Sequence, residues 1–134
     1  MDWRECLNKR IVKDIKKDEN LISSLQDTAE IKIKSADSLS EELFIAKITL
    51  LYDALREYLE ALSIMNGYKM YNHECYSAFL KEILNKQTEA ETFDKVRKIR
   101  NSLNYYGKKV DAQESKEVIK IIKTLLTEVK GWLK

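Results

Sequence analysis

The chain contains 134 residues, of which 44% are hydrophobic, and this length and composition fit one folded domain and exclude intrinsic disorder. Its 24 basic and 22 acidic residues leave a formal net charge of +2 at pH 7, so any charged binding surface has to be local. One His, two separated Cys and three scattered Gly exclude a zinc site built from His and Cys and a glycine-rich phosphate loop.

The first third of the chain has the apolar spacing of amphipathic helices, and proline is absent throughout. A spacing of four predicts a helix over residues 2–17. Its aligned apolar residues are Trp3, Leu7, Ile11 and Ile15. Asn20 is the expected cap of a second helix, whose aligned apolar residues run from Ile22 to Ala36.

A third segment is apolar on most of its sides and is expected to be the central helix of the fold. Ser38 with Glu41 three residues later has the pattern of a capping box, and the helix should continue to about Met65. The residues expected to be mostly buried are Leu50, Leu51, Leu55 and Leu62. Asn66 and Gly67 then supply a helix stop.

Three further helix starts follow in the second half. Asn72 is the expected cap of a fourth helix, Thr88 opens a capping box for a fifth, and Asp111 caps the last. The last helix carries a heptad-like apolar seam typical of bundle core, formed by Val118, Ile122, Leu125, Val129 and Trp132. We therefore predict one all-α domain over residues 1–134, an antiparallel-dominated bundle of about five to six helices.

The first residues and the most apolar run of the chain indicate a cytoplasmic protein without a membrane partner. The first residues do not form a signal peptide, and the most apolar run, residues 43–52, is too short to span a bilayer. Cys6 and Cys75 lie far apart in the sequence and are expected to be free, buried thiols.

The basic stretch, residues 95–109, is where we expect function. It carries six Lys or Arg residues and no acidic residue. Such a patch attracts phosphate groups or an acidic partner, although the same pattern is also typical of a core-packed helix with a solvated basic flank. The candidate binding residues are Arg97, Arg100, Asn101, Asn104, Lys108 and Lys109.

Residues 97–107 resemble the last motif of HEPN domains. Residues 52–62, followed by Gly67-Tyr68-Lys69 and by residues 72–75, resemble an upstream block of the same family. The resemblance covers nearly the whole chain and is greatest to small stand-alone archaeal HEPN proteins. It implies an α-helical bundle that is usually dimeric. Many such proteins are metal-independent endoribonucleases or toxins that work beside a small nucleotidyltransferase antitoxin.

The family signature places an Arg, a polar residue and, a few residues further on, a His. Arg100 and Asn101 match its start, but Tyr105, Tyr106 and Gly107 stand where the His belongs. The single His of the chain, His73, lies in another segment. Cleavage of this kind needs a base near neutral pH, and an unperturbed tyrosine titrates near pH 10.

The leading expectation is therefore a homodimeric binding protein without efficient catalysis, with no cofactor and no metal. Its ligand would be RNA, a nucleotide or a partner protein such as a nucleotidyltransferase. The alternative is a metal-independent ribonuclease or toxin that uses Arg100 to stabilise the transition state. His73 or Tyr105 would then be its non-standard base.

Overall fold

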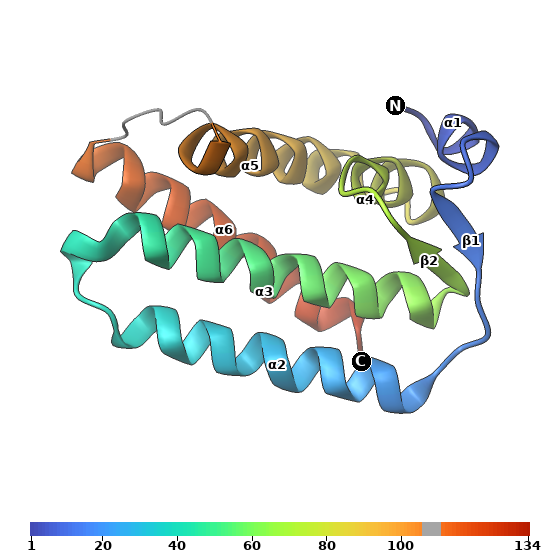
Figure 1. Cartoon of the computed structure of the whole chain (residues 1–134), viewed down its shortest axis with the longest axis horizontal. Coiled ribbons are helices and arrows are strands. Elements are labelled where there is room, and N and C mark those ends of the chain that lie inside the picture. The colour runs from blue at the N-terminus through green and yellow to red at the C-terminus, as the bar shows by residue number, and fades with distance from the viewer. Residues whose placement is uncertain (106–110) are drawn as a thin grey trace.

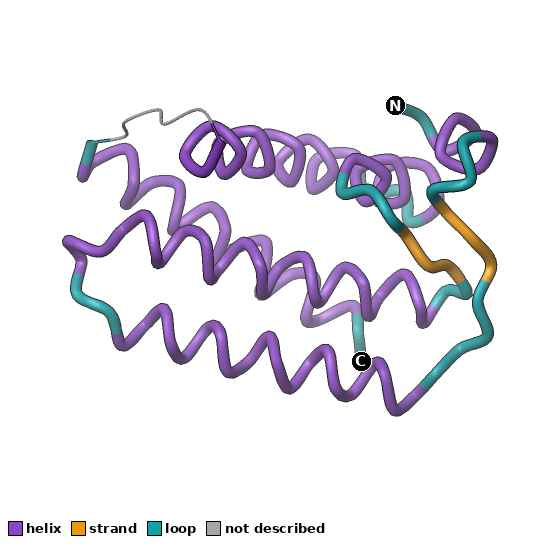
Figure 2. Tube along the Cα trace, in the orientation of Figure 1, coloured by secondary structure: helices purple, strands orange, loops and turns teal. Residues whose placement is uncertain are grey.

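The computed structural model describes the backbone of residues 1–105 and 111–134, and the side chains of residues 1–103 and 111–134. In this part of the chain, six α-helices, two short strands, a 3₁₀ turn and a π-helical turn follow one another (Figures 1 and 2). They are α1 (Trp3–Asn8), β1 (Val12–Asp14), α2 (Glu19–Ser38), η1 (Glu41–Leu43), α3 (Phe44–Met65), β2 (Tyr68–Met70), α4 (Glu74–Ala78), η2 (Phe79–Ile83), α5 (Gln87–Tyr105) and α6 (Ala112–Trp132).

Helix α3 is the centre of the bundle, as predicted. Helices α2 and α6 pack along it, and α4 and α5 lie together over the face that α2 does not cover (Figure 1). Leu51, Leu55 and Leu62 are buried, and Leu50 is half-buried. The apolar residues on most sides of this segment are therefore explained by contact with helices on more than one side.

The predicted helix over residues 2–17 is wrong, because α1 ends at Asn8. Arg10 has a positive φ of 59°, and the N–H of Ile11 donates to the carbonyl of Cys6. The N–H of Arg10 donates to the carbonyl of Leu7, so the two bonds form a Schellman stop in which Arg10 occupies the usual place of a glycine. The stop turns the chain back and starts β1.

Strand β1 pairs antiparallel with β2, so the fold is mostly helical with a small two-strand sheet and is not all-α. Val12 faces Met70 and Asp14 faces Tyr68 in the register. Neither strand could be predicted from the sequence, because three residues are too few to show an apolar–polar alternation. The sheet ties the N-terminal segment to the connection between α3 and α4 (Figure 2).

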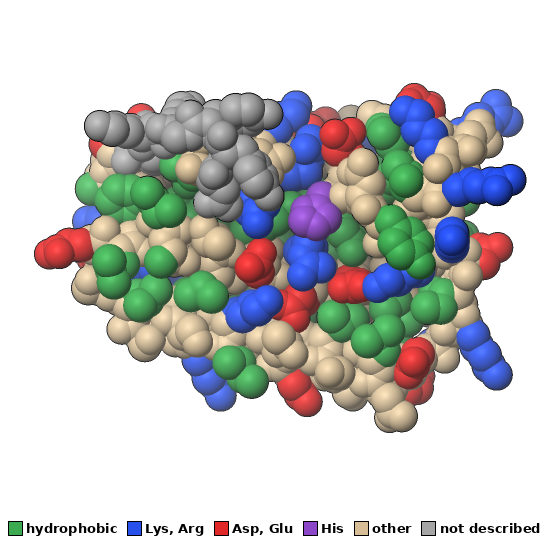
Figure 3. Space-filling model, in the orientation of Figure 1, with side chains coloured by type: hydrophobic (Ala, Val, Ile, Leu, Met, Phe, Trp, Pro, Cys, Tyr) green, Lys and Arg blue, Asp and Glu red, His purple; other side chains and the backbone are tan. Residues whose placement is uncertain are grey.

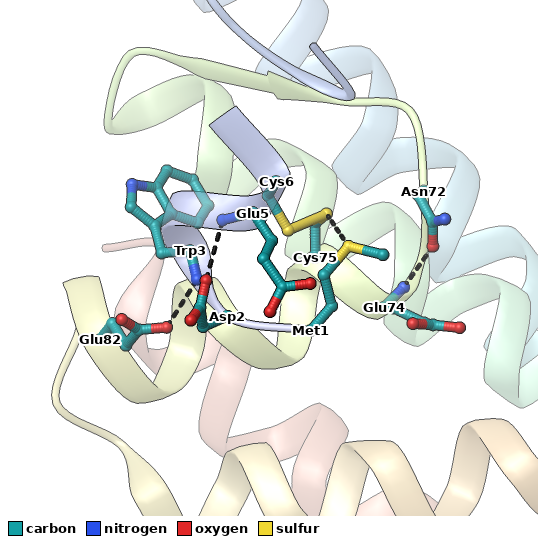
Figure 4. The surroundings of a disulfide bond; sticks show 9 residues. All are labelled: Met1, Asp2, Trp3, Glu5, Cys6, Asn72, Glu74, Cys75 and Glu82. Atoms are coloured by element: carbon teal, nitrogen blue, oxygen red, sulfur yellow. Dashed lines mark hydrogen bonds between the residues drawn. A yellow bond between two sulfur atoms is a disulfide. The ribbon is translucent and has the colours of Figure 1, made fainter. Parts of the chain in front are cut away.

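The expectation of free cysteines is also wrong, because Cys6 and Cys75 form a disulfide between α1 and α4 (Figure 4). The turn at Arg10 and the pairing of β1 with β2 bring α1 onto α4, which sequence distance could not reveal. Trp3 of α1 also contacts the next element, η2, since its backbone N–H donates to the carboxylate of Glu82 at 2.7 Å. The cytoplasmic location remains a prediction.

The helix caps agree with the sequence in part. Asp111 caps α6 as predicted, and its carboxylate accepts from the N–H of Glu114. Asp18, two residues before Asn20, caps α2 in its place, and its carboxylate accepts from the N–H of Leu21. The Ser38 capping box does not form, because Ser38 is the last residue of α2. Gly67 follows α3 with φ +88°, a conformation that glycine adopts easily.

Candidate functional site

The single histidine lies where α3, the start of α4 and α5 meet. We call this group of side chains the His73 cluster; its members are Tyr52, Asp53, Arg56, His73, Arg97 and Arg100. In Figure 3 the histidine ring reaches the surface, with basic and acidic side chains around it. The cluster therefore combines a partly exposed imidazole with several guanidinium groups.

Regular helix geometry explains how the cluster is assembled. Tyr52 and Arg56 are four residues apart on α3, and Arg97 and Arg100 are three apart on α5, so each pair shares one helix face. His73 directly precedes α4. The N-cap position of α4 is occupied by His73 and not by Asn72, so the predicted Asn72 cap is wrong. The side chain of Asn72 instead accepts from the N–H of Glu74 at 2.8 Å, a local bond that fixes the turn before the helix.

Tyr52 connects the histidine to the helix that carries Arg100. Its hydroxyl lies 3.0 Å from Nδ1 of His73, within hydrogen-bond distance. The guanidinium carbon of Arg100 lies 5.2 Å from the centre of the Tyr52 ring, a cation–π contact. The same ring is stacked with Phe93 of α5. Tyr52 is fully buried, so it is an interior member of the cluster.

The surroundings keep both rings neutral near pH 7. Burial, followed by the positive charges of Arg56 and Arg100, lowers the pKa of His73 below its usual value. Burial raises the pKa of Tyr52 to about 12, although Arg100 and Arg97 oppose that rise. The hydrogen bond at Nδ1 therefore joins a protonated phenol to a neutral imidazole.

Carboxylates from three helices balance much of the positive charge. Asp94 binds Arg97 at 2.7 Å and Lys98 at 3.2 Å, and Glu74 lies 3.9 Å from Arg97. Two further ion pairs join Arg56 to Glu60 at 3.4 Å and Arg100 to Asp53 at 3.9 Å. The basic stretch is thus less strongly positive in the fold than its sequence indicates.

The structure brings together the two catalytic candidates from distant segments, Arg100 and His73, in this one cluster. Asn101 is close by, and its side-chain oxygen accepts from Nη1 of Arg100 at 3.5 Å. The side chains of Asn104 and Tyr105, and the whole of Lys108 and Lys109, lie outside the described residues.

Three members of the cluster, Tyr52, Asp53 and Arg56, were not among the site residues expected from the sequence. All three lie in the segment that carried the upstream part of the HEPN resemblance. Arg56 also forms an ion pair with Glu60, four residues further along the same helix. The i, i+4 spacing of Tyr52 and Arg56 in the sequence indicates that they share one helix face. It does not show which helix covers that face.

Comparisons with protein-family models, curated proteins and solved structures found no match to this chain. Among the described residues, no group of three or more His, Cys, Asp or Glu side chains could hold a metal ion. Within the same residues, no helix is long and apolar enough to cross a membrane. The cluster itself can bind an anion through its guanidinium groups, with the imidazole as an additional donor or proton-transfer group.

Proposed function

We propose that this protein binds RNA through phosphate groups at the His73 cluster, as a HEPN-like homodimer that does not cleave RNA efficiently. The observation that carries the proposal is the convergence of Arg56, Arg97 and Arg100 around one partly exposed histidine. Guanidinium groups bind phosphate oxygens in a two-pronged geometry, and an imidazole N–H adds a further donor.

The neighbouring carboxylates predict that RNA binding at this cluster depends only moderately on salt concentration. Asp94 and Glu74 hold Arg97, and Asp53 lies beside Arg100, so these carboxylates orient the arginines and reduce the net charge. Such a site makes few phosphate contacts. If three arginines each contact one phosphate of a single strand, the logarithm of the affinity should fall with the logarithm of salt concentration with a slope of about −2.

The absence of a histidine shortly after Arg100 supports binding over cleavage. Among the matching positions, Tyr105 offers a phenol whose ordinary pKa is far above neutral. Loss of a general base typically costs about 10²–10⁴ in rate. The His73 ring is present in the cluster, but its Nδ1 is already engaged by Tyr52.

The dimer is the part of the proposal that depends on the HEPN resemblance. We expect a two-fold pair with α5 near the interface, so that two Arg100 side chains flank a shared cleft. The bundle also exposes Leu43 and Ile45, at 51% and 48% of their surfaces, which a second subunit could cover. Light scattering at micromolar concentration should give the mass of a dimer, and a monomer throughout that range would contradict the pairing.

Fluorescence anisotropy with a labelled single-stranded oligouridylate, without metal, tests the binding site. Arg100→Gln should lower the affinity by about ten- to hundredfold, because a charge-assisted contact is worth about 1.5–3 kcal/mol. Lys120→Gln, on an exposed position of α6, removes the same charge elsewhere and should leave the affinity nearly unchanged. Equal losses in both variants, or no binding by the natural chain, would contradict the proposal.

The ribonuclease reading is the second candidate, and the proximity of His73 to Arg100 is the observation that favours it. The same samples, run on a denaturing gel, report cleavage. Brisk cleavage abolished by both Arg100→Gln and His73→Gln would replace the binding proposal with this one. If the chain does not bind RNA but does capture a nucleotidyltransferase-type protein, the ligand would instead be a protein partner.

A further inference from the structure

The hydrogen bond between Tyr52 and His73 can run in two directions, and the two directions give the histidine opposite chemistry. If Nδ1 donates to the phenol oxygen, Nε2 has a lone pair and can act as a base. If the phenol donates to Nδ1, Nε2 carries the proton of the neutral ring and acts as a donor. The distance of 3.0 Å fits either direction, so the surroundings of the hydroxyl decide.

Burial of the phenol selects the second direction. Tyr52 is fully buried, and burial keeps its hydroxyl protonated at any pH near neutrality. Among the described residues, Nδ1 of His73 is the one hydrogen-bond partner found for this hydroxyl. A buried donor without an acceptor is unfavourable, so the phenol proton points to Nδ1.

We propose that Tyr52 is the positioning residue of the cluster, donating to Nδ1 so that His73 is held in the tautomer protonated at Nε2 and presents an N–H to a phosphate oxygen. The inference deepens the proposed function and rests on it for the identity of the ligand. It also gives a reason for binding without efficient cleavage, because Nε2 in this tautomer has no lone pair to accept the proton of a ribose 2′-hydroxyl.

The groups around the ring are consistent with an anion-facing donor. Arg56 of α3 and Arg97 and Arg100 of α5 are positive, and each lowers the pKa of His73. Asp53 of α3 has the opposite effect. The ring is thus neutral while it is surrounded by cations, and an anion placed beside Nε2 meets an N–H and guanidinium groups together.

The chain has one histidine, so nitrogen NMR of the imidazole reports the tautomer without any assignment. At pH 8, where the ring is neutral, we expect the shifts of a protonated Nε2 and of a bare, hydrogen-bonded Nδ1. Tyr52→Phe keeps the buried ring and removes only the hydroxyl, and it should give a mixture of tautomers. Tyr71→Phe is the control, because Tyr71 is 60% exposed, and it should leave both signals unchanged. A protonated Nδ1 in the natural chain would overturn the inference.

A titration of the same samples with oligouridylate separates this inference from the proposed function. RNA should move the Nε2–H signal of the natural chain, and Tyr52→Phe should bind about five- to tenfold more weakly, the loss expected for one neutral hydrogen bond or somewhat more. If the tautomer is as stated and RNA moves nothing, the ligand is wrong but the role of Tyr52 stands. If RNA binds and Tyr52→Phe retains both the tautomer and the affinity, the role of Tyr52 is refuted and the RNA site stands.

Discussion

At the scale of single residues, His73 links the cluster to the stability of the fold. Its pKa in the folded chain is lowered by burial and by Arg56 and Arg100, whereas the unfolded chain has the ordinary value of about 6.5. The unfolded state therefore binds the proton more readily as the pH falls below that value. The free energy of unfolding should then decrease from about pH 6.5 down to the lowered pKa.

This pH dependence can be measured by urea unfolding between pH 8 and pH 5. A single group can change the free energy of unfolding by at most about 1.4 kcal/mol per pH unit, and His73→Gln should remove that part of the slope. The pKa values of Glu30 and Asp94 are also lowered, but these carboxylates lose their contribution only at more acid pH. A slope that is the same in His73→Gln and in the natural chain would show that burial of the ring does not affect its titration.

The candidate site could be predicted from sequence only where one helix carried the signal. Arg100 and Arg97 were found because they lie in a run of basic residues with helical spacing. The partners of Arg100 could not be found in this way, since Tyr52 becomes a partner only when α3 packs against α5. The spacing of residues along one helix shows which face of that helix a side chain occupies. It does not show which other helix packs against that face.

At the scale of elements, two glycines should respond in opposite ways to the same substitution. Gly67 ends α3 with φ +88°, where a Cβ would meet no atom closer than 3.7 Å but the backbone conformation is unfavourable. Gly67→Ala should therefore lower the free energy of unfolding by about 1 kcal/mol.

Gly131 is the matched comparison for that substitution. It lies in α6, and a Cβ there would meet nothing within 4 Å. Gly131→Ala should raise the free energy of unfolding by up to about 1 kcal/mol, because alanine loses less conformational entropy in a helix. Thermal unfolding measures both effects. A shift of the two melting temperatures in the same direction would contradict the explanation from backbone conformation.

The elements themselves were predictable in proportion to their length. Helices α3 and α6 show many apolar repeats, and the residues expected in the α6 seam are buried except for the half-buried Trp132. Helix α1 was predicted too long because its stop uses Arg10, and an arginine at positive φ gives no sequence signal. The two strands and the Cys6–Cys75 pairing depend on that stop, so all three were missed together.

At the scale of the whole molecule, the disulfide should be the largest single covalent contribution to stability. It joins residues separated by 69 positions. The loss of chain entropy in the unfolded state predicts a stabilisation of about 4 kcal/mol for a loop of that size. Urea unfolding of the natural chain with and without reductant measures the effect, and peptide mapping by mass spectrometry checks the bond itself.

A double variant, Cys6→Ser with Cys75→Ser, provides the control for that measurement. It should unfold at the lower urea concentration of the reduced chain, and adding reductant should change nothing further. Equal stability of the oxidised chain and the double variant would show that the bond contributes no net stabilisation.

The same bond divides the chain into a closed ring and a tail. The ring, residues 6–75, contains α2, α3 and the small sheet, whereas α5 and α6 lie outside it (Figure 1). Opening of the tail alone would separate Arg97 and Arg100 from a ring that still holds Tyr52 and His73. Amide hydrogen exchange should therefore be slower in α3 than in α5, and such partial opening would remove the arginines of the site before the ring itself unfolds.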